Sequence, residues 1–144
     1  MREAVVEAVR DALAGCDFVA AAWVFGSLAR GEERSDSDLD VAILLAHEGD
    51  VTERERRALS IASAALEHAA PGGRVDLVVL GRAGPVLHHR VVRDGVLVVD
   101  RAPERRIDFV GRAIREYLDW APTHRIGMEA ALEGLARRLG RSAA

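Results

Sequence analysis

Residues 23–45, WVFGSLARGEERSDSDLDVAILL, decide the fold that we expect for this chain. Two apolar runs at the ends of this stretch, residues 21–25 and 39–45, are typical of strands. Gly26-Ser27 follows the first run, and after ten further residues Asp38 and Asp40 stand at the start of the second run. A turn suited to phosphate and two carboxylates therefore lie where the loop meets the two predicted strands.

The first strand ends in Gly26-Ser27, and a short helix is predicted to follow. Glycine lets the backbone come close to a ligand, and the amides at a helix start, with the Ser27 hydroxyl, can bind an anion. Gly31 is predicted to end this helix as a left-handed cap, which leaves Arg30 in its last turn. Arginine can hold a phosphate through two parallel hydrogen bonds. Taken alone, Gly26-Ser27 could equally be a tight turn, and Arg30 could be a solvated surface residue.

The acidic residues that follow favour a phosphate-binding site over a plain tight turn. Asp38 and Asp40 lie two residues apart at a strand start, so their carboxylates share one face of the sheet and favour a hard cation such as Mg²⁺. Asp76 lies in a third strand-like run, residues 74–80, RVDLVVL. If that run pairs beside residues 39–45, three carboxylates converge on a two-metal site. The alternative for Asp76 is an edge-strand acid that faces water.

These residues resemble a known family. The pattern GS-x10-D-x-D with a later strand Asp is similar to the DNA polymerase beta superfamily of nucleotidyltransferases. Residues 25–45 resemble its minimal, single-domain MNT branch. The resemblance implies an α/β nucleotidyltransferase fold, a small mixed sheet flanked by helices, in one domain over residues 1–144. The core is expected at about 1–100 and a helical C-terminal extension at about 103–140.

The resemblance also implies roles for individual residues. Gly26 and Ser27 would bind the triphosphate of ATP, and Arg30 would lie beside them. Asp38 and Asp40 would hold two Mg²⁺ ions, and Asp76 would hold the ion that activates an acceptor hydroxyl. The expected reaction transfers AMP to that hydroxyl and releases pyrophosphate.

The acceptor is the open question at this point. MNT proteins of this length resemble the antitoxins of HEPN/MNT toxin–antitoxin pairs, which implies transfer of AMP to a tyrosine of a HEPN ribonuclease toxin. One alternative is a small-molecule adenylyltransferase of the antibiotic-modifying kind, in which a homodimer could build the acceptor pocket. Another is an antitoxin that neutralises its partner by contact alone.

Composition limits the classes of protein to which the chain can belong. The 144 residues and 49% apolar content fit one small globular domain, and the net charge of −3 argues against direct nucleic-acid binding. All basic residues are arginine, which excludes a lysine nucleophile. A single cysteine, Cys16, suggests a reducing compartment, and no apolar run approaches a membrane span. We therefore expect a cytoplasmic protein.

Periodicity predicts the remaining elements. Residues 3–14 form an amphipathic helix with Val5, Val9 and Leu13 inward, and residues 85–91 form a helix that leads into a strand over 96–99. Thr52 and Glu55 form a capping box that begins a helix over 52–69. The residues expected on the inner side of that helix are Leu59, Ile61, Ala62, Ala65 and Leu66.

Two further helices are predicted near the end of the chain, over 104–120 and 123–139, separated by Ala121-Pro122. The first carries an apolar stripe, which indicates either core packing or a partner surface. Its residues are Val110, Ile114, Tyr117, Leu118 and Trp120.

Overall fold

The computed structural model describes residues 3–143, with side chains except at 122–129, 131 and 139–143. Its elements, in chain order, are α1 (Glu3–Leu13), β1 (Val19–Phe25), α2 (Gly26–Arg30), β2 (Leu39–Leu45), α3 (Glu53–Leu66), the 3₁₀ turn η1 (Glu67–Ala69), β3 (Val75–Val79), α4 (Pro85–Asp94), β4 (Val96–Asp100) and α5 (Pro103–Ala143). Within these ranges, no helix is long and apolar enough to cross a membrane.

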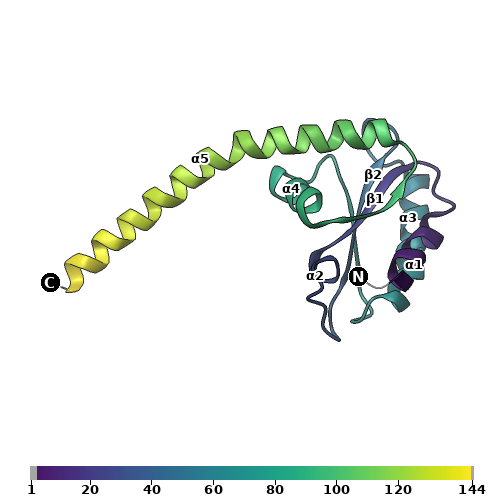
Figure 1. Cartoon of the computed structure of the whole chain (residues 1–144), viewed down its shortest axis with the longest axis horizontal. Helices are drawn as coiled ribbons and strands as arrows, with labels where there is room; N and C mark the ends of the chain where they lie inside the picture. Colours follow the sequence, from purple (N-terminus) through teal and green to yellow (C-terminus); the bar gives the residue numbers. More distant parts are fainter. Residues whose placement is uncertain (1–2, 144) are drawn as a thin grey trace.

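The four strands form one mixed sheet in the order β3-β2-β1-β4. Strand β1 runs antiparallel to both β2 and β4, whereas β3 runs parallel to β2. Helices α1 and α3 cover one face of the sheet, and α4 with the first part of α5 covers the other (Figure 1). The predicted α/β fold, a small mixed sheet flanked by helices, is confirmed.

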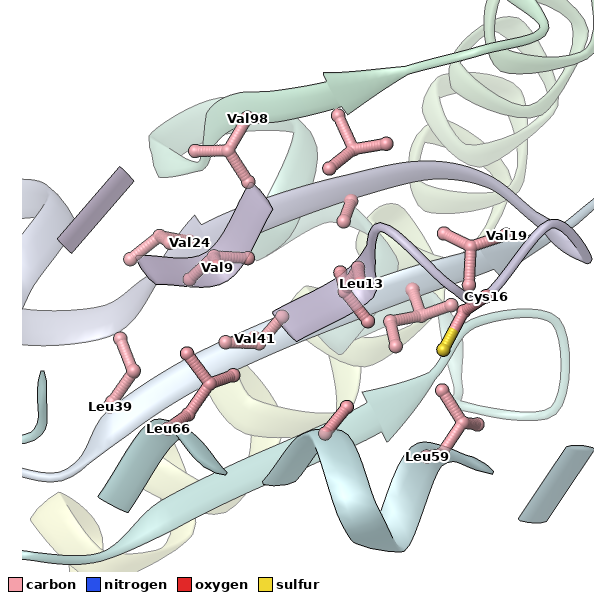
Figure 2. Packing of buried hydrophobic residues seen from close by; sticks show 14 of the residues in the cluster. Val9, Leu13, Cys16, Val19, Val24, Leu39, Val41, Leu59, Leu66 and Val98 are labelled. Atoms are coloured by element: carbon pink, nitrogen blue, oxygen red, sulfur yellow. The ribbon is translucent and has the colours of Figure 1, made fainter. Parts of the chain in front are cut away.

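The face under α1 and α3 is a closed apolar core (Figure 2). Alternation along β2 points Leu39, Val41 and Ile43 into it, and all three are fully buried. Helix α1 contributes residues at i+4 spacing, as predicted, with Val9 and Leu13 both fully buried. Burying a side chain of this size contributes about 1.5–3 kcal/mol, so this face supplies much of the stability.

Helix α3 begins with the predicted capping box. Thr52 accepts a hydrogen bond from the Glu55 amide, and the Glu55 carboxylate accepts one from the Thr52 amide. The inner side of the helix was predicted wrongly in part, because Ile61 is 72% exposed and Ala65 is also exposed. Ile61 lies two residues, or about 200° around a helix, from the buried Leu59. The buried residues are instead Glu55, Leu59, Ala62 and Leu66.

The opposite face of the sheet is held by aromatic packing. Trp23 of β1 lies with its ring centroid 6.2 Å from that of Phe109 of α5, and the ring of His88 of α4 stands edge-on to Phe109 at 5.1 Å. Val91 and Ala113 are also buried in this smaller core. These contacts fix α4 beside the start of α5.

The C-terminal region differs from the prediction. Two helices were expected, but α5 is one helix of 41 residues that continues through Pro122. Proline removes one backbone hydrogen bond and crowds the preceding turn, yet a helix can pass it with a change of direction. Figure 1 shows α5 bending along its length and extending well beyond the sheet.

Candidate active site

The two strands that carry the aspartates pair with each other, which was the condition for bringing the three carboxylates together. Strand β3 pairs in parallel with β2, and Asp40 lies directly opposite Asp76 in the register. Because Val41 points into the core under α1 and α3, Asp40 points to the α4 face, and Asp38 shares that face two residues earlier. Three carboxylates from two neighbouring strands are thus directed to one side of the sheet.

These carboxylates border a hollow of about 410 Å³. The six residues predicted for the site all line it: Gly26, Ser27, Arg30, Asp38, Asp40 and Asp76. The hollow is completed by Phe25, Val78, Leu87 and Arg90. It therefore lies between the end of β1, the starts of β2 and β3, and helix α4.

Gly26 is required by the geometry of this hollow. Its φ is +74°, a conformation that side chains disfavour, and a Cβ atom there would overlap the carboxylate of Asp40. Helix α2 starts at this glycine and ends at Arg30, and Gly31 closes it in the left-handed conformation, as predicted. The tight turn thus brings the backbone of β1 against the acidic pair.

The charges in the hollow are not balanced by the protein alone. Burial raises the pKa of Asp40 above its ordinary value, and the negative charges of Asp76 and Asp38 raise it further. Arg30 and Arg90 act in the opposite direction but do not cancel the effect. Asp40 is therefore placed where an additional positive charge would stabilise its ionised form.

Asp38 and Asp76 each have a distinct environment. Asp38 accepts a hydrogen bond from Arg74 Nε at 3.0 Å, within an ion pair at the surface. Asp76 is exposed on β3, which is an edge strand of the sheet. Asp76 therefore does lie on an edge strand, as the alternative interpretation expected. At that edge it also borders the hollow.

The donor set fits a hard divalent cation. Carboxylate oxygens are the ligands that Mg²⁺ prefers, and their mutual repulsion is what such an ion would relieve. Among the described residues, however, no three acidic, histidine or cysteine side chains already converge in metal-binding geometry. The ion pair with Arg74 engages one carboxylate oxygen of Asp38 in this structure.

Sequence reasoning missed Arg90 and Leu87. Both come from α4, which the periodicity predicted without any indication of where it would pack. The helix is oriented by its neighbour His88, whose Nε2 accepts a hydrogen bond from the Gly81 amide at 3.2 Å. His88 is buried, and burial lowers its pKa, so the ring is neutral at pH 7. No local signal in residues 85–94 could have revealed this arrangement.

A family model described as polymerase beta, nucleotidyltransferase matches residues 7–104. The match covers more than half of the chain and includes every residue of the hollow, so the chain belongs to the polymerase beta nucleotidyltransferase family. No curated protein sequence is significantly similar to the chain.

Several solved structures share the fold. A crystal structure of a toxin–antitoxin with AMP-PNP has a TM-score of 0.69 and 23% identity, with 88% of this chain and 98% of that chain covered. The MntA-HepT toxin–antitoxin structure has a TM-score of 0.66 and 20% identity, with 91% and 99% covered. A complex of tri-AMPylated Shewanella oneidensis HEPN toxin with MNT antitoxin has a TM-score of 0.60 and 21% identity, with 90% and 93% covered.

Proposed function

We propose that this chain is a Mg²⁺-dependent nucleotidyltransferase that moves AMP from ATP to a tyrosine hydroxyl of a HEPN toxin and thereby acts as its antitoxin. The observation that carries the proposal is the register of Asp40 opposite Asp76, with Asp38 on the same face, in a hollow that also contains Gly26-Ser27. This arrangement combines a place for phosphate with a place for cations.

Asp38, Asp40 and Asp76 are the residues that would hold Mg²⁺. Two bound ions would supply positive charge to the attacking and the leaving oxygens of an in-line displacement. A bound ion would replace Arg74 as the partner of Asp38, and its positive charge would offset the burial and the neighbouring negative charges that raise the pKa of Asp40. Asp76, on the open edge of the sheet, lies where an acceptor hydroxyl can approach from solvent.

The phosphates of ATP would lie against α2 and α4. The Gly26-Ser27 turn offers backbone amides and the Ser27 hydroxyl, and Arg30 and Arg90 border the same hollow. Two guanidinium groups from different elements can hold the triphosphate on two sides. A triphosphate held there would lie beside the acidic residues, and holding it in place would lower the entropic cost of reaching the transition state.

The choice of acceptor rests on similarity and on exposure. Three similar structures are toxin–antitoxin complexes, and one of them contains a tri-AMPylated HEPN toxin. The acidic edge of this chain is open at Asp76, so a side chain of a second protein can reach it. The unpaired, buried Cys16 fits a reducing compartment, and we place the reaction in the cytoplasm.

The direct test is intact-mass spectrometry of a HEPN protein encoded beside this chain, after incubation with the chain, ATP and Mg²⁺. We expect a mass gain of one or more AMP units, which is absent with the Asp38→Ala, Asp40→Ala variant. Tandem mass spectrometry should place the modification on a tyrosine. A stable complex without any mass gain would instead identify an antitoxin that acts by contact. Failure to form a complex, with AMP transferred to an aminoglycoside, would identify a small-molecule adenylyltransferase.

A further inference from the structure

The two edges of the sheet are protected differently. At the β4 edge, the Arg10 side chain donates a hydrogen bond to the backbone oxygen of Val98 at 2.8 Å. Among the residues that the structure describes, no side chain forms a hydrogen bond with the backbone of Val75–Val79 in β3. Proteins usually block an exposed edge strand, because it can pair with a further strand. The β3 edge is therefore free to pair.

The backbone groups of β3 that face outward follow from its pairing with β2. The Leu39 amide donates to the Arg74 oxygen at 2.9 Å, at the start of the strand pair. At its end, the Leu80 amide donates to the Ile43 oxygen at 2.8 Å. Backbone groups alternate in direction along a strand, so the even-numbered positions of β3 face β2. The N–H and C=O groups that face the open edge belong to Val75, Leu77 and Val79.

A groove of about 470 Å³ lies beside the same edge, between β3 and α3. We call it the edge groove. Its lining includes Val75, Leu77 and Val79 of β3 and Leu59, Ser60 and Ser63 of α3. Asp76 lines both the edge groove and the acidic hollow. A segment that lies in the edge groove would therefore reach the position proposed for the acceptor hydroxyl.

We propose that β3 and the edge groove bind the acceptor as an extended protein segment, with its tyrosine beside Asp76 and an apolar residue on each side of that tyrosine. This binding mode rests on the proposed function, since it concerns the acceptor of the same reaction. Successive side chains of a strand point to opposite faces, and paired residues share a face. A tyrosine beside Asp76 points toward the hollow, so its neighbours point into the edge groove beside Val75 and Leu77.

The position of Asp76 favours an acceptor segment over a second copy of the chain. The acceptor has to approach Asp76, which is exposed on this edge strand. A second copy paired on β3 would occupy that edge. It would also bring a further aspartate to an edge where three carboxylates already lie, and like charges on paired strands are destabilising. A tyrosine between apolar residues adds no charge there.

Substitutions on α3 test whether the edge groove binds the acceptor. Ser60 is exposed and lines the groove, so Ser60→Trp should fill part of it without disturbing the core. The KM for the HEPN protein should rise at least about tenfold, while the KM for ATP stays unchanged. Ala65→Trp is the matched control, because Ala65 is exposed on another side of α3 and does not line the groove. Both variants should melt at the same temperature.

Synthetic peptides test the extended conformation. The probe is a capped peptide of seven residues, with a central tyrosine between two valines and threonine elsewhere. AMP transfer to it should be at least about tenfold faster than to the same peptide with aspartates beside the tyrosine. Alternate amides of a paired strand face its neighbour. N-methylation of the tyrosine amide and of the next valine amide should therefore differ: one should abolish transfer, and the other should leave it nearly unchanged.

The outcomes separate this binding mode from the proposed function. Transfer to the HEPN protein that is equal in Ser60→Trp and Ala65→Trp would overturn the binding mode alone. Equal effects of the two N-methylations, or no transfer to the valine peptide at millimolar concentration, would do the same. A wild type that transfers AMP to neither the HEPN protein nor the peptide would overturn both. A wild-type dimer in sedimentation velocity that Ser60→Trp dissociates would overturn the binding mode in favour of a second copy on β3.

Discussion

The two faces of the sheet differ although the same strands build both. Along β2, Leu39, Val41 and Ile43 point into a closed apolar core, whereas Asp40, between two of them, points into an open acidic hollow. The pattern repeats on β1, where Val24 is in the core and Phe25 lines the hollow. A change of one position along a strand therefore moves a side chain from the part that stabilises the fold to the part proposed for chemistry.

The core under α1 and α3 and the charged residues of the hollow should therefore affect stability and activity separately. Substitutions on the core face should change the free energy of unfolding with little effect on transfer by the folded molecules. Substitutions of the charged residues that line the hollow should lower AMP transfer with little effect on the free energy of unfolding.

The largest effect is expected at the acidic edge. Asp76→Asn should lower the rate of AMP transfer more than about a thousandfold, because it removes the carboxylate nearest the acceptor while Asp38 and Asp40 keep the nucleotide bound. Rates of label transfer from ATP and equilibrium nucleotide binding would be measured in parallel. Asp36→Asn, in the exposed loop, is the control and should retain normal rates. Equal rates in both variants would remove Asp76 from the site.

On the core face, the expected effect is on stability. Ile43→Ala should reduce the free energy of unfolding by about 3 kcal/mol, because a fully buried side chain leaves a cavity. Urea denaturation measures this loss, and transfer per folded molecule should stay unchanged. Ile61→Ala should change stability by less than about 0.5 kcal/mol, since that side chain is exposed. Similar losses in the two variants would contradict the assignment of the inner side of α3.

Arg90 should show a smaller effect that is confined to nucleotide binding. Arg90→Ala should raise the KM for ATP about tenfold, because one of the two guanidinium groups around the triphosphate is lost. Steady-state kinetics separate the rise in KM from any change in kcat. His89→Ala is a suitable control on the same helix, since His89 stacks on Tyr117 and does not line the hollow. An unchanged KM in Arg90→Ala would exclude Arg90 from phosphate binding.

The smallest effect is a gain in stability. The pKa of Asp40 is raised in the folded chain, so ionisation of this residue costs folding free energy, and stability decreases as pH rises through the raised pKa. Without metal at pH 7, Asp40→Asn should therefore melt about 2 °C higher than the wild type. The difference should disappear at a pH below the ordinary value for aspartate, where Asp40 is protonated in both states. A lower melting temperature at pH 7 would show that the negative charge is already compensated.

Much of this architecture could be predicted because its signals are local. The Gly26-Ser27 turn, the Gly31 cap and the capping box at Thr52 each depend on a few neighbouring residues, and the structure contains all three. The structure also places the six predicted site residues around one hollow, while their roles remain predictions.

The features that sequence reasoning missed depend on distant packing. Arg90 reaches the hollow only because His88 and Phe109 fix α4 against α5. Pro122 looked like a helix end, but a proline can be accommodated within a longer helix. The apolar stripe of α5 divides into two sides because only one side meets the protein. The extent of the single domain stays a prediction.

The most direct test of the proposed site is calorimetric titration of a non-hydrolysable ATP analogue into the metal-free chain, with and without Mg²⁺, for the wild type and Asp40→Asn. We predict that the wild type binds the analogue much more tightly with Mg²⁺ and that Asp40→Asn, while fully folded, loses this difference. Equal Mg²⁺-dependent binding by both proteins would contradict the assignment of the acidic hollow as a metal–nucleotide site.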